Sequence, residues 1–410
     1  MSAIPVEPVK GTRKRLDHID AMRPVKQAAV ISTHTLVFFA PLATSATVAG
    51  LLMLTRFSRD AFFFVSACML AFSYRDTKQM NLRSYFKRRF ISVGWPYLTW
   101  TVIYYFFISA SPSSNFPYYS FSGTQVATIA GLHHFLHLLW TGYYHLYFLI
   151  VIMEFYILFP LLLAFVRRFP RWHVRIFIGA VVWQLAFGVL VSFPSMAHHL
   201  GGAVQTRLVF SYPIYLVGGV IVAMHLDVVH DWIIAHAKLI VIFTLASAAV
   251  GEWLNYAGRF SWLPNYLKSG SYVFSPMVVP YNVGAIICVY LFGVYLVSPK
   301  RTVRLRAIVQ SGSDNSYGVY LSQLLWIPML LRLRHSFVPH LSWAIVTPIA
   351  LVIVYLLGVV FTALMARTPV ARAVTGRSRA SWASLRPRRT ASESSLRGDV
   401  GDGPLEVVGE

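Results

Sequence analysis

An arginine and a histidine stand eleven residues apart in the stretch "RPVKQAAVISTH", at Arg23 and His34. If this stretch is helical, both side chains lie on nearly the same face, separated along the axis by roughly 16 Å, about half the hydrocarbon thickness of a bilayer. An imidazole is the usual general base near neutral pH, and a guanidinium holds phosphate through charge-assisted hydrogen bonds. A single ligand that contacts both groups must be long.

Other ionisable residues lie in or beside apolar segments, where a charge costs free energy unless it is paired or hydrated. Lys26 is close to the inner end of its segment, so we expect its amine to reach the interface as an anchor. We expect the Glu154 carboxyl to pair with a neighbouring helix. For His34 two interpretations stay open: a general base, or a neutral histidine hydrogen-bonded between helices.

The composition identifies the class of protein that must position these groups. Of 410 residues, 56% are hydrophobic and only 12% are charged, which is outside the range of soluble domains. We therefore predict an all-α, polytopic integral membrane bundle that contacts the lipid bilayer. The net charge is +21, but the basic residues occur in short clusters between apolar segments. This pattern indicates positive-inside topology and argues against nucleic acid as a partner.

Hydropathy predicts about ten membrane spans. Their approximate cores are residues 25–45, 60–74, 90–109, 146–166, 174–193, 207–225, 237–254, 278–298, 316–333 and 342–366.

Basic clusters orient the chain. They precede the first predicted span and follow the second, fourth and eighth, whereas the stretch 110–145 contains no Lys or Arg. The positive-inside rule then places both termini in the cytoplasm of a multi-pass plasma-membrane protein. We expect a basic cytoplasmic segment over 1–24, a transmembrane domain over 25–366 and a disordered cytoplasmic tail over 367–410.

Several motifs follow one another along the chain. In "IDAMRPVKQAAVISTH", Asp20 is followed three residues later by Arg23 and then, after ten residues, by His34. The stretch "DAFFFVSACMLAF" contains Asp60 and Ser66. It is followed by "KRRFISVGWPYLTW", "YHLYFLIVIMEFYILFP" and "SYGVYLSQ". Together, and in this order, these stretches resemble the motifs of the acyltransferase-3 family of membrane O-acyltransferases.

The chain departs from the family pattern at five positions. Ala67 replaces a usual Gly, Tyr147 a common Trp, Ser92 the second Arg of an Arg-x-x-Arg pattern, Gln323 a frequent His and Pro24 a usual Gly. Pro24 also predicts that Arg23 is extended, just outside the start of the helix. In these departures the chain resembles the subset of the family associated with exopolysaccharide modification.

The resemblance implies an enzyme that moves an acyl group, acetyl or similar, from cytoplasmic acyl-coenzyme A to a hydroxyl of a cell-envelope carbohydrate, glycolipid or related acceptor. It implies that Arg23, Arg88 and Arg89 hold the donor's phosphates and that His34 is the general base. A basic cytoplasmic loop that only fixes topology is the alternative for the loop arginines. Acyl-coenzyme A would be a substrate, and no permanently bound cofactor is expected.

Three further residues have expected roles in the site. Asp20 and Asp60 would orient basic partners, and Ser66 would donate a hydrogen bond, with plain helix packing as the alternative for each. His133, His134 and His137 share the spacing of one helical face, but no carboxylate is near them in the sequence, and we expect no metal site.

A second class of function competes with catalysis. An exporter of a lipid-linked glycan or polysaccharide would also be polytopic and basic. Such a protein is expected to contain internal repeats and interrupted helices, and the sequence contains no convincing repeat. The aromatic stretch "SNFPYYSFSG" over 114–123 fits a sugar-stacking platform or an interfacial aromatic belt equally well.

Overall fold

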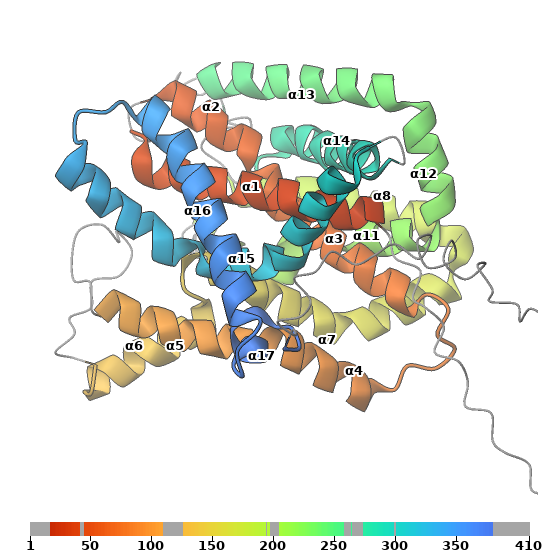
Figure 1. Cartoon of the computed structure of the whole chain (residues 1–410). Coiled ribbons are helices and arrows are strands. Elements are labelled where there is room, and N and C mark those ends of the chain that lie inside the picture. The colour runs from red at the N-terminus through yellow and green to blue at the C-terminus, as the bar shows by residue number, and fades with distance from the viewer. Residues whose placement is uncertain are drawn as a thin grey trace, which may run out of the picture.

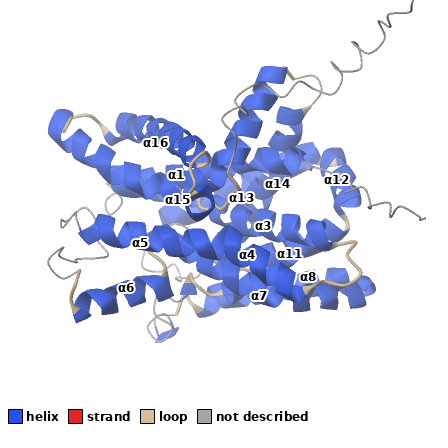
Figure 2. Ribbon diagram, turned by 60° about the horizontal axis from the view of Figure 1, so that its bottom comes forward, coloured by secondary structure: helices blue, strands red, loops and turns tan. Residues whose placement is uncertain are grey.

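A computed structural model describes residues 17–41, 45–109, 126–193, 195–196, 205–257, 264, 274–298 and 301–379. Over these residues the regular structure is helical, and no strand is present (Figures 1 and 2). This confirms the predicted all-α class.

The α-helices have these bounds: α1 Asp17–Phe39, α2 Ala46–Thr55, α3 Phe57–Tyr74, α4 Leu82–Arg89, α5 Trp95–Ser109, α6 Ile129–Thr141, α7 Tyr147–Arg168, α8 His173–Leu190, α11 Pro213–Met224, α12 Leu226–Ala235, α13 Ala237–Ala257, α14 Val279–Val297, α15 Val303–Phe337, α16 Trp343–Met365 and α17 Ala371–Thr375. The short helical turns are η1 Phe90–Gly94, η3 Tyr144–Leu146, η4 Pro170–Trp172, η5 Val209–Ser211 and η7 Pro276–Val278.

Several segments of the described chain are long and apolar enough to cross a membrane. They are Tyr144–Arg168, Pro170–Leu190, Ala237–Ala257, Pro276–Val297 and Trp343–Met365, five in all. Helices α11 and α12, which meet at a bend of 102°, would make a sixth if they count as one span. The polytopic membrane architecture is thereby confirmed, whereas the number of ten spans stays a prediction.

Helix α1 lies in the middle of the bundle (Figure 1). It packs against α14, α15 and α16 along its length, and against α2 and α3. A second tight contact joins α3 and α11, where a Cβ added at Gly219 would lie 2.6 Å from the Phe64 carbonyl oxygen. Small residues let helix backbones approach closely in membranes, so Gly219 sets this distance.

The start of α1 differs from the prediction. We expected Pro24 to leave Arg23 extended outside the helix, but α1 begins at Asp17 and Pro24 lies inside it. Asp17 and Asp20 stand in the first turn, where negative charge is favourable at a helix N-terminus. Pro24 stands two turns further on, where it removes one hydrogen-bond donor and crowds the carbonyl of Asp20, and its ring packs against Gly312 of α15. Arg23 is therefore helical, one turn beyond Asp20.

Candidate active site

A cavity of about 180 Å³ lies beside His34. Its walls come from α1, from the junction of α2 and α3, from the start of α7 and from α15. The lining residues are Val30, Thr33, His34, Arg56, Ser58, Arg59, Phe62, His145, Tyr147, Phe148 and Tyr320. The described walls thus combine two imidazoles and two guanidinium groups with aromatic rings, and no carboxylate is among these described residues.

His34 lies on the last turns of α1, which is helical from Arg23 through His34 as the spacing argument requires. Its Nδ1 atom is buried and has no hydrogen-bond partner. Gln323 of α15 is close enough to interact with the ring, but neither of its own amide atoms makes a hydrogen bond of normal geometry. Both interpretations of His34, a general base and a neutral histidine between helices, therefore stay predictions.

A second histidine, His145, faces the same cavity. The centres of the His34 and His145 rings are 6.1 Å apart, and both ring nitrogens of His145 are buried without a partner. The preceding residue, Tyr144, has φ = 39°, which is unusual for a non-glycine residue. Such backbone strain is often found at functional sites. The Tyr144 and His34 rings meet in an edge arrangement, with 5.4 Å between ring centres.

Arg59 and Asp60 form a buried ion pair at the start of α3. Arg59 Nε lies 3.0 Å from Asp60 Oδ1, and the second carboxylate oxygen accepts a hydrogen bond from Asn282 Nδ2 at 2.7 Å. The guanidinium also lies 5.0 Å from the ring centre of Tyr212 and 5.2 Å from that of Phe274. Asp60 thus contacts a basic partner as expected, and its part in catalysis stays a prediction.

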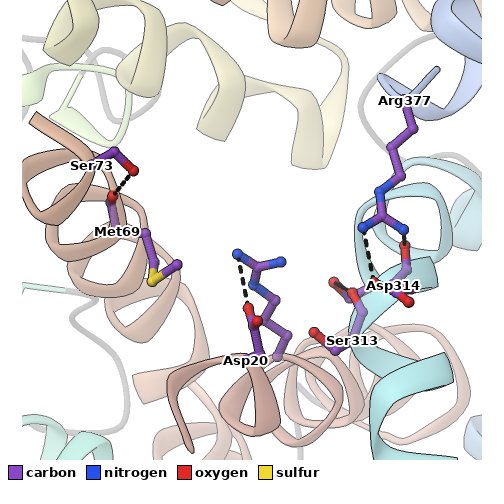
Figure 3. Close-up of polar contacts among 8 residues, drawn as sticks. Asp20, Met69, Ser73, Ser313, Asp314 and Arg377 are labelled. Atoms are coloured by element: carbon purple, nitrogen blue, oxygen red, sulfur yellow. Dashed lines mark hydrogen bonds and ion pairs between the residues drawn. The ribbon is translucent and has the colours of Figure 1, made fainter. Parts of the chain in front are cut away.

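Asp20 and Arg23 pair at the other end of α1. Arg23 Nη2 lies 3.3 Å from Asp20 Oδ1, an i to i+3 contact made possible by the helical backbone. In the view of Figure 3, Asp20 lies between Ser73 of α3 and Asp314 of α15. Arg377, which follows α17, reaches Asp314 Oδ1 with its Nη2 atom at 3.0 Å. Two guanidinium groups are therefore held by carboxylates at this end of the bundle.

The loop arginines have different neighbours. Arg88 is exposed and donates from Nη2 to the Tyr74 hydroxyl at 3.1 Å. The Arg89 guanidinium lies 5.4 Å from the ring centre of Tyr156 on α7, and its Nε is buried without a partner. None of these contacts involves α1, so a shared binding site with Arg23 stays a prediction.

Lys26 does not behave as an interfacial anchor. Only 4% of it is exposed, and its Nζ atom lies 3.2 Å from the ring centre of Phe62, which lines the cavity. The prediction failed because α1 is central in the bundle, so its charged residues face other helices. Ser66 is half-buried two turns beyond Arg59 on α3 and does not line the cavity.

Glu154 makes one contact of the expected kind. Its Oε2 atom accepts a hydrogen bond from the Val209 backbone N–H at 2.8 Å, at the first residue of η5. This is a structural contact with a neighbouring element, as predicted, although the partner is a short helical turn and carries no charge.

The sequence analysis missed three cavity residues: His145, Arg56 and Arg59. His145 was quoted only within a family-like motif, and the two arginines stand just before the motif that begins at Asp60. The available signal was their charge at the edge of an apolar segment, where ionisable groups are expensive. Over the part of the chain that is described, no group of three or more His, Cys, Asp or Glu side chains could hold a metal.

Of two features in the region predicted to face outside, the structure describes only one. His133, His134 and His137 lie on α6. The aromatic stretch 114–123 lies outside the described residues.

The comparison with protein families decides the assignment. A model of the acyltransferase domain of the acyltransferase-3 type matches residues 17–367, nearly the whole helical bundle. The chain belongs to the acyltransferase-3 family. The match begins at the first residue of α1 and includes both the Arg23 end and the cavity beside His34. No curated protein and no solved structure matched the chain. The exopolysaccharide subset stays a prediction.

Proposed function

We propose that this acyltransferase moves an acetyl or similar acyl group from cytoplasmic acyl-coenzyme A to a hydroxyl of a cell-envelope carbohydrate, glycolipid or related acceptor. The family assignment supports acyl transfer. The observation that carries the finer proposal is the His34 imidazole in a cavity, with a buried Nδ1 atom that has no hydrogen-bond partner, on the same helix as Arg23. Eleven helical residues separate the two side chains by about 16 Å, a distance that the pantetheine arm of coenzyme A can bridge.

His34 acts as the general base in this proposal. It takes the proton of the acceptor hydroxyl while the hydroxyl oxygen attacks the thioester carbonyl carbon. The new C–O bond forms, the C–S bond breaks, and the coenzyme A thiolate leaves and receives the proton from the imidazolium. Gln323 and His145 are the neighbouring polar side chains whose hydrogen-bonding capacity is unused, so they can orient the imidazole or the reacting oxygen.

The donor's phosphates bind at the Arg23 end. A guanidinium held by one carboxylate still has free donor directions for phosphate oxygens. Arg88 and Arg89 are the additional phosphate ligands in this proposal. They lie at the end of α4, in a segment that the positive-inside rule predicts to be cytoplasmic.

Purified protein in proteoliposomes tests the proposal. We expect it to hydrolyse radiolabelled acetyl-coenzyme A slowly, and to form an ester when extracts of the native envelope are added. Arg23→Ala should raise the KM for acetyl-coenzyme A by about tenfold to a hundredfold, because a lost charge-assisted contact costs about 1.5–3 kcal/mol. Arg332→Ala, an exposed arginine on α15, is the matched control.

The same experiment separates the enzyme from an exporter. An exporter would move a labelled glycan across the proteoliposome membrane without consuming acetyl-coenzyme A. Transport of this kind, with no ester formed by well-folded protein, would contradict the proposed function.

A further inference from the structure

We propose that the acceptor carries an oxyanion, a carboxylate or a phosphate, close to the hydroxyl that is acylated, and that Arg56 binds it. This inference rests on the proposed function and names the class of acceptor. Arg56 lies at the residue where α2 ends and α3 begins, and it lines the same cavity as His34 and His145.

The charges in the cavity walls favour an anion. Among the described residues of the lining, Arg56 and Arg59 are the cationic side chains and none is Asp or Glu. Asp60 lies behind the lining, only 1% exposed, and its two oxygens are used by Arg59 and Asn282. The charge of Arg59 is therefore balanced within the protein, and its guanidinium is fixed beside Tyr212 and Phe274.

Arg56 adds a second positive charge to the walls. A guanidinium inside a membrane domain is expensive, and such residues usually mark a ligand or ion path. Arg56 is half-buried, and Tyr147 is another residue of the same lining. A planar guanidinium matches the geometry of a carboxylate or phosphate and can bind either one through paired hydrogen bonds.

The anion has to arrive with the acceptor. In the proposed function the phosphates of acyl-coenzyme A bind near Arg23, about 16 Å along α1 from His34. What reaches His34 from the donor is the neutral thioester. An anion beside His34 and Arg56 therefore belongs to the second substrate, for example a uronic acid or a sugar phosphate.

A thiol-reactivity experiment tests the charge of the cavity without any turnover. Thr33 lines the cavity, so Thr33→Cys is made in a protein whose own cysteines are replaced (Cys68→Ala, Cys288→Ser). The detergent-purified protein is treated with the anionic reagent sulfonatoethyl methanethiosulfonate or with its trimethylammonium analogue. Each rate is divided by the rate for free mercaptoethanol.

We expect the anionic reagent to react roughly tenfold faster than the cationic one, because a nearby guanidinium attracts it at low ionic strength. Adding Arg56→Gln should remove most of this preference, whereas Arg332→Gln should not. A preference for the cationic reagent, an unchanged ratio in Arg56→Gln, or no reaction with either reagent would overturn the proposal.

A second experiment measures which acceptors the enzyme prefers. Proteoliposomes receive acetyl-coenzyme A with methyl glucoside, methyl glucuronide or glucose 1-phosphate. We expect the carboxylate or the phosphate acceptor to be used with a KM about tenfold lower than that of the neutral sugar, and the better of the two identifies the anion. Arg56→Gln should abolish this difference.

The readouts separate the two hypotheses. A rise in the KM for acetyl-coenzyme A hydrolysis in Arg56→Gln as large as that in Arg23→Ala would assign Arg56 to the donor and overturn the inference. Equal use of all three sugars by the wild type would also overturn it while leaving acyl transfer established. If acetyl-coenzyme A is not consumed under any condition, the proposed function fails, and the thiol reactivities still decide the charge of the cavity.

Discussion

His34 is half-buried and Asp60 is buried, and their polar atoms differ in how far they are satisfied. Asp60 is held by Arg59 and Asn282, so its hydrogen-bonding capacity is largely used. His34 has a buried nitrogen with no partner. Polar groups in protein interiors are usually satisfied, and an exception needs an explanation. A substrate that completes the hydrogen bond explains His34, whereas Asp60 is explained by the protein alone.

His34→Gln tests the difference for the imidazole. Gln keeps hydrogen-bonding capacity and approximate size but cannot take a proton near neutral pH. We expect ester formation to fall by roughly a hundredfold to ten-thousandfold, the usual contribution of a general base, in protein that stays monodisperse. His236→Gln is the matched control, because His236 is exposed and stacks on Trp232. Near-normal turnover by His34→Gln would rule out the base mechanism.

Asp60→Asn tests the buried pair. Removing one partner leaves the Arg59 charge uncompensated, which typically costs about 3–5 kcal/mol. We expect a clearly lower unfolding temperature in detergent, measured by intrinsic fluorescence. The double variant Arg59→Met, Asp60→Asn should recover much of the loss, because it removes the unpaired charge as well. If the single variant unfolds at the wild-type temperature, the pair is not the contact that holds the start of α3.

The sequence predicted how the residues of α1 lie relative to one another, but it did not predict which residues of other elements contact them. Asp20, Arg23 and His34 lie on one helix, so their relation follows from the periodicity of that helix. His145 and Arg56 reach His34 from other elements, through a strained turn at Tyr144 and a junction between two helices. Contacts of this kind depend on tertiary packing, which a single sequence does not specify.

At the scale of the elements, the position of α1 depends on how the helices around it pack. The sequence predicted most helices, but it placed the first one too late. Pro24 suggested that the helix begins after Arg23, whereas Asp17 and Asp20 favour a helix N-terminus before it. The sequence predicted the end of a span at residue 225 but not the bend of 102° between α11 and α12, where the chain contains neither Gly nor Pro. Hydropathy gives the length of a segment but not its direction.

Gly219→Val tests the packing of α3 against α11. The added side chain would collide with the Phe64 carbonyl oxygen, the Ala67 Cβ and the Cys68 backbone nitrogen, none of which can move without shifting α3. Because α3 carries Arg59 and Phe62 into the cavity, we expect both lower thermal stability and reduced acyl transfer. Gly179→Val on α8 is the control, since nothing lies within 4 Å of a Cβ there. Equal tolerance of both substitutions would contradict the role of Gly219.

At the scale of the whole molecule, the basic clusters gather at one end of the bundle. Arg167, at the end of α7, donates to the carbonyl oxygens of Arg75 and Thr77 just after α3, so these two helix ends meet. The start of α7 lies at the opposite end, where His145 faces His34 near the end of α1. Arg23 is therefore on the same side as the α3 and α7 ends, which carry most of the loop arginines.

This arrangement predicts the orientation of the protein in the membrane. By the positive-inside rule the Arg23 end faces the cytoplasm, where acyl-coenzyme A is available, and the His34 cavity lies toward the outer face. A reporter fused near Lys78 or after Arg377 should therefore read inside, and one fused near Ser122, which is outside the described residues, should read outside. At each site we compare the activity of a periplasmic reporter, such as alkaline phosphatase, with that of a cytoplasmic reporter. A cytoplasmic signal at Ser122 would reverse the bundle, place the Arg23 end away from the donor, and exclude the donor path from Arg23 to His34.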